Sequence, residues 1–324
     1  MAKRLIEASP SILAALSGKE LLDSLRICGG RAVSAEVVAF QPALIDGVSN
    51  AALSAAFGAD IIHFNHYDVD KPQIAGMPSI PEGIAAWEQA GIALRPNDQV
   101  EGPSGSFFKN LGLGMTLRDV RQQIGRVVGV SLEVDFDGAD APAGRVASPE
   151  TARKALAQGA AYITLIGTPA HTPDVLAKNI LRLRQALGDE VVLSAGRMPW
   201  GGSRPGMPDF LLSAEVETLA ESGANIVVIA APGTMPGATI EEVQSSVNAA
   251  HRHGLLAKVT IGTSQESADE STVIRLALDG KLTGADIFQI GDGGFCGMSI
   301  PESILAFSIA IKGRRHTYRR MAMC

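Results

Sequence analysis

Three carboxylates stand in or at the end of two apolar, strand-like segments of the sequence. Glu36 lies in the segment 32–40, and Glu133 and Asp135 close the segment 127–135. Buried carboxylates are costly unless they pair with a cation or bind a metal. Carboxylate oxygens suit Mg²⁺, and carboxyls with separated pKa values suit general acid–base catalysis. We predict that Glu36 and Glu133 are catalytic and that Glu133 and Asp135 bind Mg²⁺. Two other interpretations stay open, namely a salt-bridged interior and a turn role for Asp135.

Lys258 and His63 add basic groups to this set. Lys258 lies in the segment 256–261, and His63 lies in the segment 60–65. A desolvated lysine can form a Schiff base, stabilise an enolate or simply pair with a carboxylate. A histidine at a strand end can transfer protons or be a hydrogen-bonded structural residue. We predict that both are catalytic, with Lys258 stabilising a developing enolate.

Three more polar residues stand at or just past the ends of strand-like segments, namely Asn65, Thr168 and Arg197. An arginine in this position can bind a carboxylate or phosphate bidentately, although a solvated loop arginine is the simpler interpretation. We predict that these three residues bind substrate.

Two glycine-rich turns follow the last two strand-like segments. Their phosphate-binding candidates are Gly262, Thr263, Ser264, Gly291, Gly293 and Gly294. Backbone amides of such turns, beside a helix that starts near Pro301, make an anion site. Barrels that bind phosphorylated substrates often place the phosphate between these two loops. Asp292 conflicts with this prediction, because its charge would repel a phosphate unless it pairs with a cation or faces away.

Eight strand-like segments alternate with eight helical patterns and position these residues. The strand-like segments are 32–40, 60–65, 127–135, 161–167, 191–197, 225–231, 256–261 and 286–290. The helical patterns are 49–58, 116–125, 149–159, 173–188, 208–223, 239–254, 269–284 and 301–312. This alternation predicts a parallel sheet, and eight units predict a (β/α)8 TIM barrel. The competing architecture is an open doubly wound sheet. No GxGxxG follows the first strand, so no nucleotide-cofactor motif is present.

Alternation of residue types predicts which side chains enter the barrel. In the segment 127–135, Val128, Val130, Leu132 and Val134 share one parity, and Ser131, Glu133 and Asp135 share the other. The apolar face must meet the helices, so we expect the polar face to point inward. The same reasoning places Ser34, Glu36, His63, Asn65, Tyr162, Thr164, Lys258, Thr260 and Gln289 inside.

Two segments fall outside the repeating pattern. Residues 9–27 form one helical pattern within an N-terminal extension, 1–30, that we expect to cover the bottom of the barrel. A connection of about 50 residues, 66–114, follows the second strand and carries a short helical stretch at 81–91. Long connections in barrels are usually functional loops. We expect residues 1–324 to form one barrel domain.

Composition limits the classes of partner. The chain has 324 residues, a net charge of −6 and three cysteines without disulfide or zinc spacing. We therefore expect no nucleic-acid partner, no membrane span and a cytoplasmic protein that binds a small-molecule substrate. Barrels of this type often self-associate, so we also expect a homo-oligomer. The basic run from Lys312 to Arg320 is expected to be a solvated helix end.

The eight units and the two terminal glycine turns resemble the phosphate-binding group of (β/α)8 barrels. The segments Ala143–Ser148 and Gly159–Thr168 resemble bacterial barrels of the phosphoenolpyruvate-phosphonomutase-like group. This resemblance implies an enzyme that acts on a small phosphorylated or carboxylated metabolite. We predict a Mg²⁺-assisted lyase or isomerase. The alternatives are a non-catalytic barrel that binds a phosphorylated ligand, as a sensor or assembly subunit, and a Schiff-base aldolase that uses Lys258.

Overall fold

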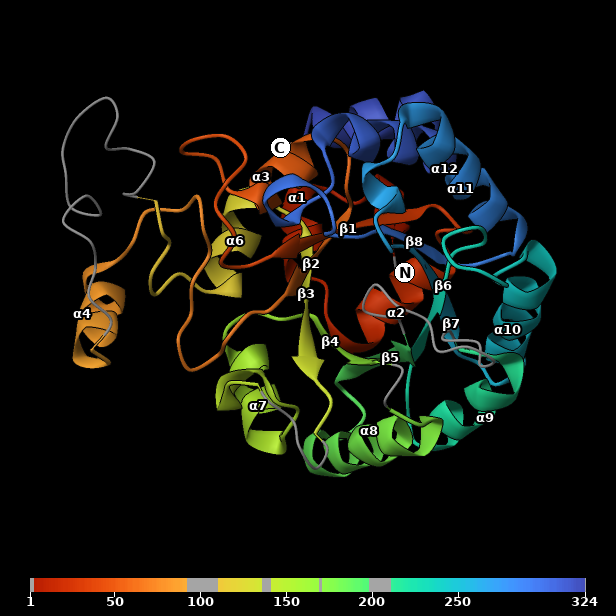
Figure 1. Ribbon diagram of the computed structural model, residues 1–324, viewed down its shortest axis with the longest axis horizontal. Coiled ribbons are helices and arrows are strands. Elements are labelled where there is room, and N and C mark those ends of the chain that lie inside the picture. Colours follow the sequence, from red (N-terminus) through yellow and green to blue (C-terminus); the bar gives the residue numbers. More distant parts are fainter. Residues whose placement is uncertain (1–2, 92–109, 136–140, 169–170, 198–210, 324) are drawn as a thin grey trace.

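The computed structural model is a closed barrel of parallel strands inside a ring of helices (Figure 1). It describes residues 3–91, 110–135, 141–168, 171–197 and 211–323. The strands are β1 (Ala32–Val38), β2 (Ile61–Asn65), β3 (Val127–Glu133), β4 (Tyr162–Gly167), β5 (Val192–Arg197), β6 (Ile226–Ala230), β7 (Leu256–Ile261) and β8 (Ile287–Ile290). Each strand pairs in parallel with the next, and β1 closes the barrel against β8. The predicted (β/α)8 barrel is confirmed.

The helices are α1 (Pro10–Ala15), α2 (Gly18–Arg26), α3 (Asn50–Ala56), α4 (Pro81–Gln89), α6 (Leu117–Ile124), α7 (Pro149–Ala157), α8 (Pro173–Leu187), α9 (Ser213–Glu221), α10 (Ile240–Arg252), α11 (Glu270–Leu282) and α12 (Pro301–Met321). Helices α3 and α6 to α12 follow the strands and surround the barrel, α1 and α2 precede β1, and α4 stands in the connection after β2 (Figure 1). Side-chain oxygens cap the first turns of several of them, from Ser49, Ser148, Thr172, Thr239 and Asp269. None of the helices in the described ranges is long and apolar enough to cross a membrane.

The two faces of each strand separate as the residue pattern predicts. On β3, Val128 and Val130 belong to the core between sheet and helices. Ser131 and Glu133 instead line a central pocket. The barrel interior is therefore unusually polar, whereas barrels normally fill this space with Val, Ile and Leu.

The N-terminal segment forms two helices rather than the single helix predicted for residues 9–27. The chain leaves α1 at Leu16 and Ser17, which have extended backbones, and Gly18 takes a left-handed φ of +52°. As predicted, the segment closes the bottom of the barrel. Leu21 and Leu25 of α2 pack in one cluster with the first inward residues of the strands, among them Ile61, Val127, Val192, Ile226, Leu256 and Ile287.

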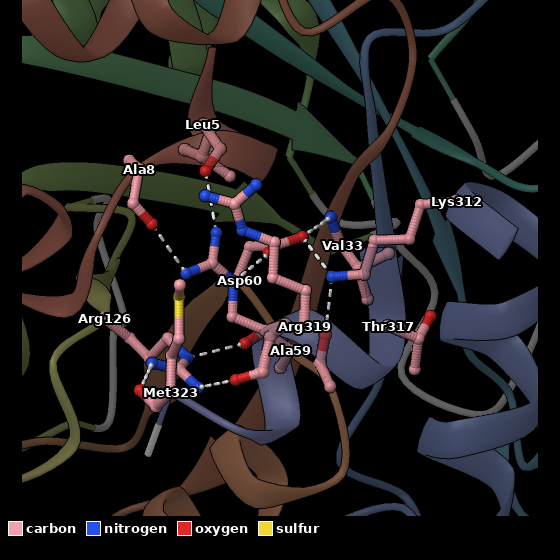
Figure 2. A network of polar contacts seen from close by, with 12 residues as sticks. Leu5, Ala8, Val33, Ala59, Asp60, Arg126, Lys312, Thr317, Arg319 and Met323 are labelled. Atoms are coloured by element: carbon pink, nitrogen blue, oxygen red, sulfur yellow. Dashed lines mark hydrogen bonds and ion pairs between the residues drawn. The ribbon is translucent and has the colours of Figure 1, made fainter. Parts of the chain in front are cut away.

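The basic run is solvated only in part, because Arg314, Arg315 and Arg319 are exposed as expected, whereas Lys312 and Arg320 are buried. Helix α12 continues past Lys312, with a non-helical Gly313 (φ 76°), and ends at Met321. Lys312 Nζ and Arg320 Nε donate to the Asp60 carboxylate at 2.6 and 2.7 Å. These three side chains are at most 5% exposed. Figure 2 shows this network, which ties the end of α12 to the start of β2.

The long connection after β2 is anchored at both ends. Ile74 N–H donates to the Gly112 carbonyl at 3.1 Å, and Gly76 N–H donates to the Asn110 carbonyl at 2.7 Å. The predicted short helix is present as α4, which lies away from the barrel axis (Figure 1). Residues 92–109 of the predicted 66–114 loop lie outside the described residues.

Candidate active site

A pocket of about 360 Å³ lies at the C-terminal ends of the strands. Strands β1, β2, β3, β7 and β8 supply its polar walls, and β4 and β6 supply Ile166 and Val228. The other lining residues are Glu36, Val38, Asn65, His66, Ser131, Leu132, Glu133, Thr260, Ile261, Gly262, Thr263, Glu266, Gln289, Gly291 and Asp292. Barrel enzymes place their chemistry at this face, so we treat the pocket as the candidate active site.

Glu36 is the central acidic group of the pocket. Burial and the neighbouring carboxyls of Asp292 and Glu266 hold the pKa of Glu36 well above its usual range. Lys258 and a hydrogen bond with the Gln289 side chain act in the opposite direction. A carboxyl raised in this way is suited to carry a proton near neutral pH.

Asp292 belongs to the same acidic cluster, which explains why it did not fit a phosphate site. Asn65 Nδ2 donates to Asp292 Oδ2 at 3.1 Å. Burial raises the pKa of Asp292, while this hydrogen bond and the nearby His66 lower it. Asn65, predicted to bind substrate, thus contacts the pocket and positions Asp292.

Lys258 lies beneath the pocket rather than in its wall. Its side chain is buried, and Nζ donates at 2.9 Å to Oε1 of Gln289, which lines the pocket. Burial lowers the pKa of Lys258 to about 8, and the charge of Glu36 opposes this shift. In this arrangement Lys258 acts on Glu36 and Gln289, both of which line the pocket, while Lys258 itself is outside the described lining.

His63 is also buried below the pocket, in a chain of polar side chains. Its Nε2 lies 2.8 Å from Ser131 Oγ, and its Nδ1 lies 3.0 Å from the Tyr162 hydroxyl. Tyr162 hydrogen-bonds Ser34 in turn, and Ser34 Oγ donates to Gln289 Oε1 at 3.2 Å. Burial and Lys258 hold the pKa of His63 well below its usual range, so the ring is neutral.

The orientation of the Gln289 amide determines which group donates in each hydrogen bond of this chain. Lys258 can only donate, so the atom it contacts is the amide oxygen Oε1, and Ser34 Oγ must also donate to that oxygen. The Ser34 proton is then not available for a hydrogen bond to Tyr162. We therefore assign the Tyr162 hydroxyl proton to Ser34 and the His63 proton to Nδ1, which donates to Tyr162. That tautomer leaves His63 Nε2 as an acceptor for the Ser131 hydroxyl proton. Ser131 consequently presents only lone pairs to the pocket.

Glu133 is paired with Arg145. Arg145 Nη2 donates to Glu133 Oε1 at 2.6 Å and also contacts His66 Nδ1. Burial and Arg145 lower the pKa of His66. Glu133 thus lines the pocket as a neutralised ion pair. Among the described residues, no group of three or more His, Cys, Asp or Glu side chains is arranged to hold a metal ion.

The two glycine-rich turns hold an internal carboxylate, that of Glu266. Backbone N–H groups of Ser264, Glu266 and Gly293 hydrogen-bond its carboxyl and lower its pKa. Burial and Asp292 act more strongly, and the net pKa is raised. A Cβ on Gly293 would lie 1.8 Å from Glu266 Oε1, so only glycine permits this approach. A phosphate at these turns would have to displace Glu266.

The other predicted phosphate ligands have partners within the loops. Gly262 N–H donates to Thr234 Oγ1 at 3.0 Å, and Gly291 N–H donates to the Ile261 carbonyl at 3.0 Å. Thr263 Oγ1 donates to the Gly262 carbonyl at 2.7 Å. Of the six residues, Gly262, Thr263 and Gly291 line the pocket, whereas Ser264, Gly293 and Gly294 are absent from its described lining.

Three predicted site residues lie away from the described lining of the pocket. Asp135 accepts from Arg182 Nη1 of α8 at 2.7 Å, because β3 ends at Glu133 and the strand alternation stops there. Arg197 has the outward parity on β5, and its Nη2 donates to both carboxylate oxygens of Glu215 at 2.7 and 2.8 Å. Thr168 N–H donates to His171 Nδ1 at 2.8 Å.

The predicted site lacked several residues of the pocket lining, namely Ser131, His66, Glu266, Gln289 and Asp292, and also Arg145, the partner of Glu133. The inward parity of Ser131 and Gln289 was visible in the sequence. Arg145 stands in the segment that resembles the phosphonomutase-like barrels. Glu266 had a weaker signal, an acidic residue two positions after the Gly262-Thr263-Ser264 turn.

Comparison with known proteins places the chain in a family. Tryptophan synthase from M. tuberculosis aligns with 14% identity over 94% of this chain and 99% of its own, with a TM-score of 0.48. An archaeal fructose 1,6-bisphosphate aldolase aligns with 12% identity over 89% of this chain and 97% of its own, with a TM-score of 0.47. At these scores neither likeness carries information about chemistry. A search of curated proteins found no match. The family model described as "Domain of unknown function (DUF7916)" matches residues 6–324, and the chain belongs to that family.

Proposed function

We propose that this protein is an enzyme that transfers protons on a small polar metabolite in the barrel mouth, with the overall reaction of a lyase or isomerase. The supporting observation is Glu36, a pocket carboxyl whose pKa is held well above its usual range by burial, Asp292 and Glu266. A carboxyl of this kind can exchange a proton with a substrate carbon or hydroxyl near neutral pH.

The surrounding residues have distinct roles in this proposal. Glu36 is the catalytic acid or base. Lys258, with a pKa of about 8, stabilises the charge of Glu36 from below when the carboxyl ionises. Ser131 accepts a hydrogen bond from a substrate donor, and Asn65 positions Asp292.

Proton exchange in D₂O tests the proposal without knowledge of the full reaction. A panel of small hydroxy, keto, amino and phosphorylated metabolites is incubated with the protein, and deuterium incorporation is followed by NMR. We expect one chemical class to exchange, and Glu36→Gln to slow its exchange by about 10²-fold or more. Asp135→Asn removes a carboxylate outside the pocket and should leave the rate within a factor of two. Exchange that survives in Glu36→Gln would exclude the role of Glu36.

A second candidate is Schiff-base chemistry at Lys258. Its burial and its pKa of about 8 are typical of lysine nucleophiles. The amine lies outside the described pocket lining and donates to Gln289, which argues against it, because a carbonyl would have to break that hydrogen bond. Borohydride trapping with carbonyl metabolites separates the two mechanisms. Covalent labelling of Lys258 would favour the second, and its absence the first.

Assistance by Mg²⁺ also remains a prediction. Its carboxylate ligands would come from the pocket, since Asp135 pairs with Arg182 outside it. The same exchange assay, repeated with Mg²⁺ and with EDTA, measures any dependence on the metal.

A further inference from the structure

The pocket carries more carboxyls than cationic side chains to match them. Its described lining contains Glu36, Glu133, Glu266 and Asp292. Arg145 accounts for Glu133 through a 2.6 Å ion pair. Of the remaining three, only Glu36 has a described lysine close enough to shift its pKa, and that lysine lies below the pocket. Carboxyls that are buried without enough counter-charge call for protons or for a cation from outside.

Glu266 is the carboxyl of this group that most clearly lacks a partner. Its side chain is only 2% exposed, and it lines the pocket. Oε1 lies against the Gly293 turn, while Oε2 is buried without a hydrogen-bond partner among the described residues. A buried acceptor without a donor costs about 1–3 kcal/mol, so a ligand that donates to Oε2 would recover that free energy.

We propose that Glu266 and Asp292 bind an organic ammonium group beside Glu36, so that the substrate is a small amine-bearing metabolite. A primary ammonium has three N–H donors and can give one to each carboxylate. The pocket volume of about 360 Å³ suits a small metabolite.

The arrangement would also place the amine beside the acid that does the chemistry. An ammonium held by Glu266 and Asp292 leaves the adjacent carbon or hydroxyl of the ligand near Glu36. Ser131, which offers only lone pairs, would accept from a second donor on the same ligand. This inference rests on the proposed function and adds the class of substrate to it.

Binding of simple cations tests the ammonium site directly. Ethylammonium chloride is titrated into the full-length protein by calorimetry, with tetramethylammonium and Mg²⁺ as comparison cations. We expect ethylammonium to bind at least 10-fold more tightly than tetramethylammonium, which has the charge but no N–H. Asp292→Asn and Glu266→Gln should each weaken ethylammonium binding about 10-fold, equivalent to about 1.4 kcal/mol.

Asp135→Asn is the matched control, because its carboxylate pairs with Arg182 outside the pocket. It should change ethylammonium binding less than twofold. Thermal unfolding shows whether each variant is folded, and either of the two pocket variants suffices for the test. No binding of ethylammonium, equal binding of tetramethylammonium, or binding of Mg²⁺ alone would each overturn the ammonium site. Proton exchange that depends on Glu36 while ethylammonium fails to bind would overturn this inference and leave the proposed function standing.

Discussion

The two ends of the barrel both bury charged side chains, but they satisfy them in different ways. At the N-terminal end, Asp60 meets two cations, Lys312 and Arg320, in a region closed to solvent. At the C-terminal end, Glu36, Glu266 and Asp292 meet in a pocket with too few cations. The first cluster has surplus positive charge and the second has surplus negative charge.

Backbone carbonyls satisfy the surplus at the N-terminal end. Arg320 donates from Nη1 and Nη2 to the carbonyls of Ala8 and Leu5 at 3.1 and 2.7 Å. Arg126, which is fully buried, donates to the carbonyls of Ala55, Ala59, Ile124, Gly125, Arg320 and Met323. Several of these contacts appear in Figure 2. The carbonyls come from the ends of α3, α6 and α12, where the helix dipoles favour a cation.

Among the described residues, the carboxyls at the C-terminal end have no matching supply of donors. Only Glu266 has several backbone N–H groups, and its Oε2 remains without a partner among the described residues. The difference indicates that the N-terminal cluster holds the fold together. The C-terminal cluster leaves carboxyl oxygens available to a ligand, and their burial without partners lowers the stability of the fold.

Asp60→Asn should produce the largest effect on stability, because it leaves two buried cations without their carboxylate. We expect a loss of about 3–5 kcal/mol in the free energy of unfolding, measured by urea denaturation at pH 7. Lys312 and Arg320 lower the pKa of Asp60, so its contribution is present above its unfolded pKa and is lost as the pH falls through the folded value. The cost of the substitution should therefore shrink in strong acid.

Asp135→Asn provides the matched control for this experiment. It removes a carboxylate from an ion pair with Arg182 in which both side chains are more than 40% exposed. Exposed pairs contribute about 0–1 kcal/mol, so the control should lose far less stability than Asp60→Asn. Equal losses of stability in the two variants would mean that the N-terminal cluster does not hold the fold together.

Glu266→Gln should raise the free energy of unfolding, whereas Asp60→Asn lowers it. It removes a carboxylate that lacks counter-charge, and we expect a gain of about 1–2 kcal/mol in the free energy of unfolding at pH 8. The folded pKa of Glu266 is raised, so wild-type stability is full below the unfolded pKa and is lost as the pH rises through the folded value. The gain should therefore disappear at pH 4, where the wild-type carboxyl is protonated. A loss of stability at pH 8 would show that the N–H groups of the Gly293 turn outweigh the missing cation.

The fold was predictable because the same sequence pattern, an apolar strand-like segment followed by a helical one, repeats eight times. Eight apolar segments, each bounded by a glycine or a capping residue, constrain one another, and an error of one or two residues at an end changes nothing. The N-terminal cluster was not predictable, because Asp60, Arg126 and Arg320 are far apart in sequence. Nothing local distinguishes the buried Arg320 from a solvated helix end.

The site was predictable only where strand parity applies. Glu36, Asn65, Ser131 and Glu133 sit on strands, so alternation places them in the pocket. Asp135 lies past the end of β3, where alternation stops. Glu266 enters the pocket from a loop, and its position follows from its contact with Gly293, which only the fold creates.

Tyr162→Phe should give a small change in stability but a specific change in the pocket. Loss of the hydroxyl removes the link between His63 and Ser34, at a cost of about 1 kcal/mol. In the wild-type protein we expect the ¹⁵N chemical shifts of His63 to show a protonated Nδ1 and an unprotonated Nε2. In Tyr162→Phe, Nδ1 loses its acceptor, so the proton should move to Nε2 and be donated to Ser131.

Tyr67→Phe separates this effect from the general cost of a buried tyrosine. Tyr67 is equally buried, and its hydroxyl donates to Gln158 Oε1 at 2.7 Å, away from His63. The control should lose similar stability and leave the His63 shifts unchanged. A wild-type His63 protonated at Nε2 would mean that each of its two hydrogen bonds runs in the opposite direction. Ser131 would then offer its proton to the pocket, and the mouth would contain a donor where we infer an acceptor.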